Sequence, residues 1–243
     1  MLLNRILNDQ FKLLLFQPFR PDLQAHYRAY LLYGLVVTWL AGIGRYWDNT
    51  RADWWQFAGL GSLAYVFILA ALLWAVIAPL KPSRWRFRDV LLFVTMTSLP
   101  ALLYAIPVER FMPLPQAQMV NDIFLAIVAT WRVILLVMFL KRAAGLTGTS
   151  ILVAACLPLS LIVSALGMLN LEHVVFNIMA GNGGQSSPSG NDGAFLIVFL
   201  MTIISMTTLP GWLAAYLVLV VRARRGRNRE GVGGRAPQKT SQR

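Results

Sequence analysis

The sequence has few charged residues and almost no cysteine. Charged residues make up 13% of its 243 residues, whereas a soluble domain carries roughly a quarter, so the composition excludes most water-soluble proteins. The one cysteine, Cys156, excludes an intramolecular disulfide. Apolar residues reach 57%, with a mean hydropathy of +0.60. These values are typical of a polytopic membrane protein.

Recognisable enzyme motifs are also missing. The sequence contains no Gly-x-Ser-x-Gly, no His-Glu-x-x-His, no phosphate loop of the Walker type and no Gly-x-Gly-x-x-Gly. It has two histidines, His26 and His173, and a metal site needs three or four converging ligands. We therefore expect no catalytic residue, no metal site and no cofactor.

What the chain does contain is a series of long apolar runs. Six runs approach the roughly 20 residues that cross the hydrocarbon core of a bilayer: 30–44, 57–80, 90–107, 122–140, 149–169 and 194–221. The first is short, and a five-span alternative remains if it does not cross. The runs predict an all-α membrane helix bundle of about six transmembrane helices, with residues 29–221 as its membrane domain.

The basic residues are distributed unevenly between the runs. The N-terminal segment, the second and fourth connections and the C-terminal segment together hold 18 of the 22 Lys and Arg residues. Because Lys and Arg close to a span stay on the cytoplasmic side, this pattern predicts a cell inner membrane protein with both termini in the cytoplasm. An even number of spans follows, which favours six.

The two ends of the chain have different compositions. In residues 1–28, apolar side chains recur at helical spacing up to Phe16 and predict an amphipathic helix in the cytoplasmic interface, followed by a linker. Residues 222–243 are strongly basic and predict a disordered cytoplasmic tail. Its first arginines are candidates for contact with anionic lipid, although they can also act only as topology determinants: Arg222, Arg224, Arg225 and Arg227.

Arg132 is the one charged residue well inside a predicted span, nine positions before Lys141. An arginine near the middle of a membrane costs about 2.5–3.5 kcal/mol on insertion scales, and no predicted span has an interior acid to pair with it. Two roles stay open: a structural arginine that bonds freed carbonyls, or an anchor for an anionic ligand. In the second case Trp131 beside it, and Thr207 and Pro210 in a span that proline can break, are further candidates.

A second candidate group gathers in the predicted outer connections, where both charge signs alternate with aromatic residues. It favours either recognition of a head group or partner protein, or an aromatic belt whose charges pair with one another. The candidate residues are Arg45, Asp48, Arg51, Trp54, Trp55, Glu172 and His173.

Residues 130–158 form another pattern. Trp131 is followed by Leu135 and Leu136, then by the turn Gly145-Leu146-Thr147 and a new apolar run. This stretch resembles the Yip/Yif-type membrane proteins, in which a Trp-bearing span leads through a Gly-Leu-Ser/Thr turn into the next. The resemblance implies a non-enzymatic helical bundle that organises membrane or partner proteins, and it supplies no catalytic residue.

The sequence leaves three functions open. The first is a non-enzymatic accessory or scaffold protein whose cytoplasmic face contacts anionic lipid, with a membrane protein as a possible partner and no nucleic acid. The second is a transporter or flippase that receives an anionic or lipid substrate at Arg132 and proline-broken helices. The third, an enzyme acting at the outer face through Asp48, Glu172 or His173, lacks a recognisable constellation.

Overall fold

The described part of the chain is built from helices. The computed structural model describes residues 2–18, 23–47, 53–82, 85–168 and 192–233, and each regular element in these ranges is a helix. The helices are α1 (Leu2–Leu14), α2 (Leu23–Gly44), α3 (Trp54–Phe57), α4 (Leu60–Ile77), α5 (Phe87–Met96), α6 (Leu114–Arg142), α7 (Thr149–Met168) and α9 (Asp192–Gly233), with the short 3₁₀ segments η1 (Ala78–Leu80), η2 (Leu99–Ala105) and η3 (Val108–Arg110). The predicted all-α class is confirmed.

Five segments are long and apolar enough to cross a membrane. They are Leu60–Leu80, Phe87–Ala105, Met119–Arg142, Thr149–Met168 and Phe199–Arg225. They match five of the six runs predicted from the sequence. The sixth, 30–44, lies in α2, which is not among the five; its backbone is non-helical at His26 (φ −128°, ψ 16°), and the polar residues His26 and Arg28 lie in its first turns.

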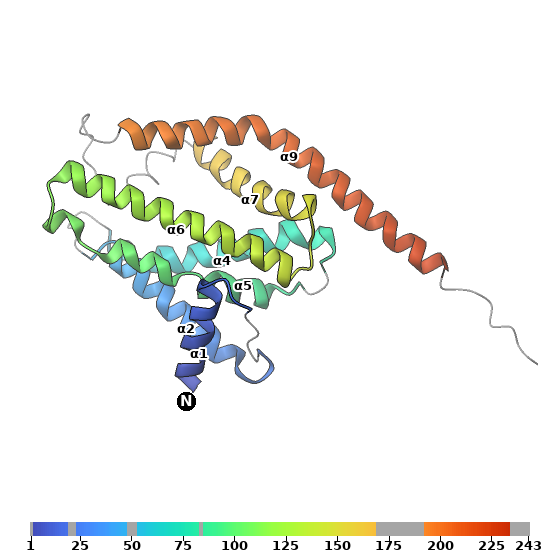
Figure 1. Cartoon of the computed structure of the whole chain (residues 1–243), viewed down its shortest axis with the longest axis horizontal. Coiled ribbons are helices and arrows are strands. Elements are labelled where there is room, and N and C mark those ends of the chain that lie inside the picture. Colours follow the sequence, from blue (N-terminus) through green and yellow to red (C-terminus); the bar gives the residue numbers. More distant parts are fainter. Residues whose placement is uncertain (1, 19–22, 48–52, 83–84, 169–191, 234–243) are drawn as a thin grey trace, which may run out of the picture.

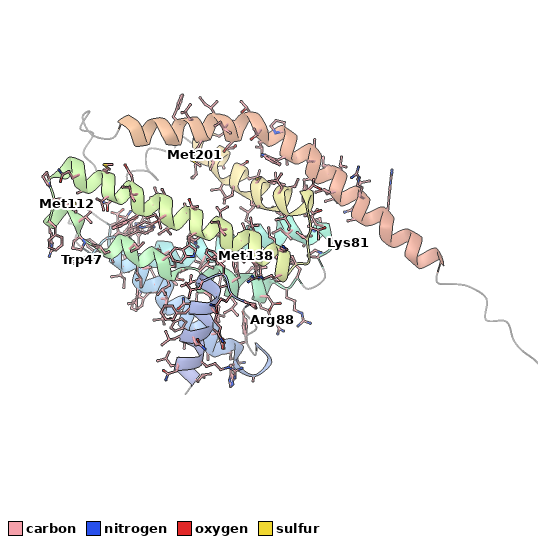
Figure 2. The ribbon with its side chains drawn as sticks, viewed as in Figure 1. Trp47, Lys81, Arg88, Met112, Met138 and Met201 are labelled. Carbon is pink, nitrogen blue, oxygen red and sulfur yellow. The ribbon has the colours of Figure 1, made fainter. Side chains whose placement is uncertain are left out.

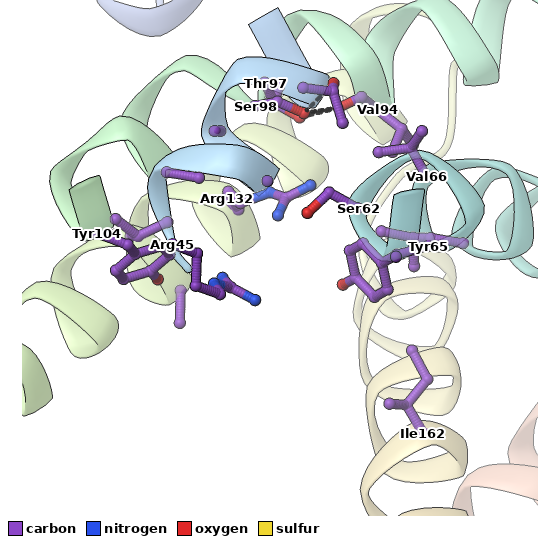
Figure 3. Close-up of a pocket in the computed structure, with 18 of the residues that line it drawn as sticks. Arg45, Ser62, Tyr65, Val66, Val94, Thr97, Ser98, Tyr104, Arg132 and Ile162 are labelled. Carbon is purple, nitrogen blue, oxygen red and sulfur yellow. Dashed lines mark hydrogen bonds between the residues drawn. The ribbon is translucent and has the colours of Figure 1, made fainter. Parts of the chain in front are cut away.

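The third predicted span, 90–107, is not one continuous α-helix. Helix α5 ends at Met96, and the chain continues as the 3₁₀ segment η2. Pro100 has no N–H, so the carbonyl of Met96, four residues earlier, loses its helical donor. The hydroxyls of Thr97 and Ser98 lie 3.0 and 3.3 Å from the carbonyl of Val94 (Figure 3) and stabilise the end of α5. The span is therefore a broken helix.

Helix α1 lies across the bundle and is bonded to it (Figure 1). Its residues Ile6, Gln10 and Leu14, one turn apart, are buried. Gln10 Nε2 donates to the carbonyl of Met96 at 3.0 Å, and the Tyr33 hydroxyl donates to Gln10 Oε1. Gln10 thus takes the place of the donor that Pro100 lacks. The side chains of Leu3, Phe11 and Leu15 stay exposed on the adjacent face.

The apolar core lies at one end of the bundle. Phe93 of α5 and Phe139 of α6 stack with ring centroids 4.1 Å apart, and Trp85 packs against Phe139 at 5.7 Å. Buried residues of α4 and α7, such as Leu73 and Ala154, complete this cluster. The basic connections lie at the same end, as Lys81 and Arg88 show in Figure 2, opposite Trp47 and Met112.

Helix α9 is the most peripheral long helix. It packs on α7 and extends beyond the rest of the bundle (Figure 1). The sequence predicts that this span ends near Val221 and that a disordered tail begins at Arg222, but the helix continues to Gly233. Arginine and alanine are good helix formers, and extending an existing helix avoids the cost of nucleation. Residues from 234 onward lie outside the described part.

Candidate functional site

A cavity of about 510 Å³ lies in the half of the bundle away from the basic end. Its walls come from the last turns of α2, most of α4, α5 with η2, the middle of α6 and the second half of α7. Core residues such as Leu73, Phe93 and Leu136 form its floor. The other end is closed by packed aromatic rings such as Phe93 and Phe139, and the cavity extends to Arg45 and Tyr46 near the end that carries Trp47.

Close approach of α2 and α4 shapes one wall. A Cβ atom added at Gly42 of α2 would lie 2.8 Å from Ser62 Cβ and 2.9 Å from the carbonyl of Gly59. Gly59, just before α4, has a φ of +67°, a left-handed conformation that glycine adopts without strain. The two glycines therefore let the start of α4 lie directly against α2, with Ser62 and Tyr65 facing the cavity.

Two arginines line the cavity. Arg132 projects from α6, on the same helical face as Leu125, Ala129 and Leu136. Arg45 is the first residue after α2. Figure 3 shows the Arg132 head group near Ser62 and Tyr65, and the Arg45 head group directed toward the same space. Residues whose positions differ by 87 in the sequence are thus brought into one site.

Aromatic rings face these arginines. Arg132 Cζ lies 5.9 Å from the centroid of the Tyr65 ring, and Arg45 Cζ lies 4.8 Å from that of Tyr104, distances typical of cation–π contacts. Among the described residues, none that line the cavity is acidic, and the one ion pair joins Arg88 and Asp89. The cavity therefore carries an excess of positive charge.

Besides the two arginines and Gln56, the polar side chains that line the cavity carry hydroxyl groups. Thr38 Oγ1 lies 2.8 Å from the carbonyl of Gly34 and 2.9 Å from Ser98 Oγ, so the break after α5 is tied to α2. Beside Arg45, burial raises the pKa of Tyr46 while the neighbouring Arg45 acts in the opposite direction. The Tyr46 phenol thus stays neutral at pH 7 and adds no negative charge.

The structure separates Arg132 from its other predicted partners. The Trp131 ring nitrogen donates to the carbonyl of Leu14 at 2.9 Å, so this side chain holds α1 instead of lining the cavity. Thr207 Oγ1 lies 2.8 Å from the carbonyl of Ile203 in its own helix, α9. Neither Thr207 nor Pro210, which lies inside α9, is part of the cavity wall. Successive residues of an α-helix are rotated by about 100° around its axis, because 3.6 residues make one turn. The adjacent side chains of Trp131 and Arg132 therefore face different neighbours.

The predicted outer group is divided. Arg45 and Trp55 line the cavity, whereas Trp54 is 75% exposed. Asp48, Arg51, Glu172 and His173 lie outside the described residues. Nearby, Arg110 Cζ lies 4.8 Å from the Trp47 ring centroid, and Trp47 Nε1 donates to the carbonyl of Ala105. The arginines described at this end, Arg45 and Arg110, therefore contact aromatic rings.

Sequence reasoning missed the link between Arg45 and Arg132 and the contributions of Tyr65 and Tyr104. Helical spacing could have placed Arg132 on a face with Leu125 and Ala129, but the position of Tyr104 depends on the 3₁₀ geometry of η2. Within the described residues, no cluster of His, Cys, Asp and Glu could hold a metal ion. Comparisons with protein-family models, curated proteins and solved structures found no match, so the role of the site rests on its own geometry.

Proposed function

We propose that the chain is an inner-membrane protein that binds an anionic, lipid-like substrate at Arg132 and carries it between leaflets, as a transporter or flippase does. The observation that supports this most is the cavity itself, in which Arg132 faces tyrosine and serine side chains and no acid among the described residues. An arginine kept in such a place at a cost of several kcal/mol finds its counterion in a ligand.

The broken helix beside the cavity supports the same role. Transporters build their sites where helices are interrupted at membrane depth, because unwound segments present polar groups to the substrate. Here the interruption between Met96 and Leu99 brings Thr97 and Ser98 to the cavity wall. A purely structural bundle has no need of such an interruption next to an arginine.

Six spans with both termini in the cytoplasm form part of the proposal. The Tyr27 hydroxyl, near the start of α2, donates to the carbonyl of Arg88, and Trp47, just after α2, donates to that of Ala105. Helix α2 thus runs the full length of α5 and η2. This favours α2 as the sixth span, with α1 at the cytoplasmic interface and the exposed Leu3, Phe11 and Leu15 directed toward lipid.

A scaffold role is the second candidate, and the basic end favours it. Arg142 donates to the carbonyl of Gln17 at 3.0 Å, and Lys81 Nζ lies 3.4 Å from the carbonyl of Ala223. The four basic segments therefore meet at one end, where Arg222, Arg224, Arg225 and Arg227 extend them. Such a surface can hold anionic lipid head groups. The resemblance to Yip/Yif-type proteins fits this candidate and stays a prediction.

Native mass spectrometry of the protein in mild detergent tests the proposal. We expect the wild type to retain anionic lipid and Arg132→Gln to lose it. Arg110→Gln is the matched control, because Arg110 also contacts an aromatic ring but lies outside the cavity. Equal retention in wild type and Arg132→Gln would contradict a substrate site. An Arg132→Gln protein with a lower melting temperature and an unchanged lipid content would make Arg132 structural and favour the scaffold.

A further inference from the structure

Arg45 gives the cavity a second positive charge that the function proposed above does not require. It follows the last residue of α2 and lines the same cavity as Arg132. Its Nε is buried and makes no hydrogen bond. Arg45 Cζ lies 4.8 Å from the Tyr104 ring centroid and Arg132 Cζ lies 5.9 Å from that of Tyr65, and both rings line the same cavity.

Two like charges in one cavity restrict the number of negative charges that a suitable ligand carries. In a low-dielectric site their repulsion is stronger than in water, and a ligand with one negative charge would leave one guanidinium without a counterion. A ligand with two negative charges neutralises both. Guanidinium groups also match phosphate oxygens in bidentate geometry, which makes phosphate the suitable chemistry.

We infer that the cavity selects a head group with two negative charges, a phosphomonoester or diphosphate, held between Arg45 and Arg132. This inference rests on the proposed function and names the substrate class of the same site. The hydroxyls of Ser62 and Tyr65 can donate to the remaining phosphate oxygens.

The rest of the cavity fits an apolar chain. Beyond the arginines its wall is formed by side chains such as Leu69 of α4 and Leu159, Ile162 and Leu166 of α7. At about 510 Å³ the cavity has the size of a small-molecule site, so it holds a head group with the first part of a chain. Leu159 keeps 36% of its surface exposed, so this part of the wall is open enough for an apolar chain to lie against it.

The position of Arg45 indicates the side of entry. It lies at the end of the bundle that carries Trp47, opposite the basic connections. In the proposed orientation this is the extracytoplasmic end. The head group therefore meets Arg45 first and Arg132 at greater depth, which gives the two arginines successive positions along one path.

Lipid titrations followed by native mass spectrometry test the inference. The probes are phosphatidic acid, a phosphomonoester, and phosphatidylglycerol, a phosphodiester with one charge, carrying identical acyl chains. We expect the wild type to bind phosphatidic acid about tenfold more tightly or better, since a hydrogen bond to a charged group contributes about 1.5–3 kcal/mol. Arg45→Gln should bind both lipids equally, and Arg110→Gln should behave as the wild type.

The controls separate the two proposals. Arg45→Lys keeps the charge without the bidentate geometry, so it should retain part of the preference even if Arg45→Gln fails to fold. Equal wild-type affinities for the two lipids, or an unchanged preference in Arg45→Gln, would overturn the dianion inference while leaving a lipid site at Arg132. Wild-type protein that binds neither lipid and no pyrophosphate would overturn both.

A competition experiment with pyrophosphate shows whether the phosphate belongs to a lipid or to a soluble compound. Pyrophosphate carries the same chemistry without an apolar chain. If it displaces phosphatidic acid only at concentrations far above that of the lipid, the ligand is a phospholipid or another phosphate with an apolar chain. If it binds as tightly as the lipid and needs both arginines, the two-charge site stands and its ligand is a soluble phosphate compound.

Discussion

At the scale of single residues, Gln10 has a role that its position near the N-terminus does not suggest. It is completely buried, and its amide joins two groups of other helices, the carbonyl of Met96 and the hydroxyl of Tyr33. Because Pro100 cannot donate to Met96, removing Gln10 would leave a buried carbonyl without a partner. The side chain therefore compensates for the break that shapes the cavity wall.

We predict that Gln10→Leu destabilises the protein by about 1–3 kcal/mol, the cost of leaving a buried polar group unsatisfied. The measurement is thermal unfolding in detergent, followed by tryptophan fluorescence. Gln17→Leu is the matched control, since the Gln17 side chain is exposed and its bond to Arg142 uses the backbone carbonyl. If both variants melted at the same temperature as the wild type, the contact with Met96 would contribute nothing measurable.

The sequence predicts some of these residues and not others. Arg132 was identified because a charge inside an apolar run is conspicuous. Arg45 is predicted to belong to an outer recognition group, since nothing in the local pattern shows that it lines the same cavity as Arg132. Nothing in the sequence singles out Gln10, because its partner Met96 lies 86 positions away. Residue types are visible in a sequence, whereas contacts between distant segments depend on packing.

At the scale of elements, the fit between α2 and α4 is set by glycine. Gly42 leaves no space for a methyl group against Ser62 and the backbone of Gly59. By contrast, Gly211 in α9 has nothing within 4 Å of an added Cβ. Two glycines in membrane helices thus have opposite surroundings, one at a packed contact and one facing outward.

We predict that Gly42→Ala and Gly211→Ala change stability in opposite directions. In α2 the added methyl forces the helices apart, at a cost of about 1–3 kcal/mol. In α9 the same change raises helix propensity by up to about 1 kcal/mol. Melting temperatures in detergent give the comparison. Equal shifts in the two variants would mean that the close approach of α2 and α4 does not limit the fold.

The boundaries of the elements show how well long apolar runs predict where a span begins and ends. The spans over α4, α6 and α7 were placed within a few residues of their observed ends, because long apolar runs bounded by charge or glycine leave few alternatives. The break within the span 90–107 and the continuation of α9 past Val221 were not predicted. Both depend on local hydrogen bonding, in one case around Pro100 and in the other along an already formed helix.

At the scale of the whole molecule, the two ends of the bundle differ in chemistry. One end gathers the basic connections, joined by bonds such as Arg142 to Gln17. The other carries Trp47 and Met112. This polarity follows from the alternation of basic and weakly charged connections, which the sequence shows directly. In the proposed orientation, with the basic residues retained in the cytoplasm, the end that carries Trp47 faces outward.

Cysteine labelling of intact cells tests this orientation together with the number of spans. In a Cys156→Ser background, we predict that Met112→Cys reacts with a membrane-impermeant maleimide, while Lys81→Cys and Gln17→Cys react only after permeabilisation. Gln17 decides whether α2 crosses the membrane, because a five-span chain would place its N-terminal segment on the side opposite Lys81. Labelling of Gln17→Cys in intact cells with Lys81→Cys protected would therefore reject six spans, and labelling of Lys81→Cys with Met112→Cys protected would reverse the orientation.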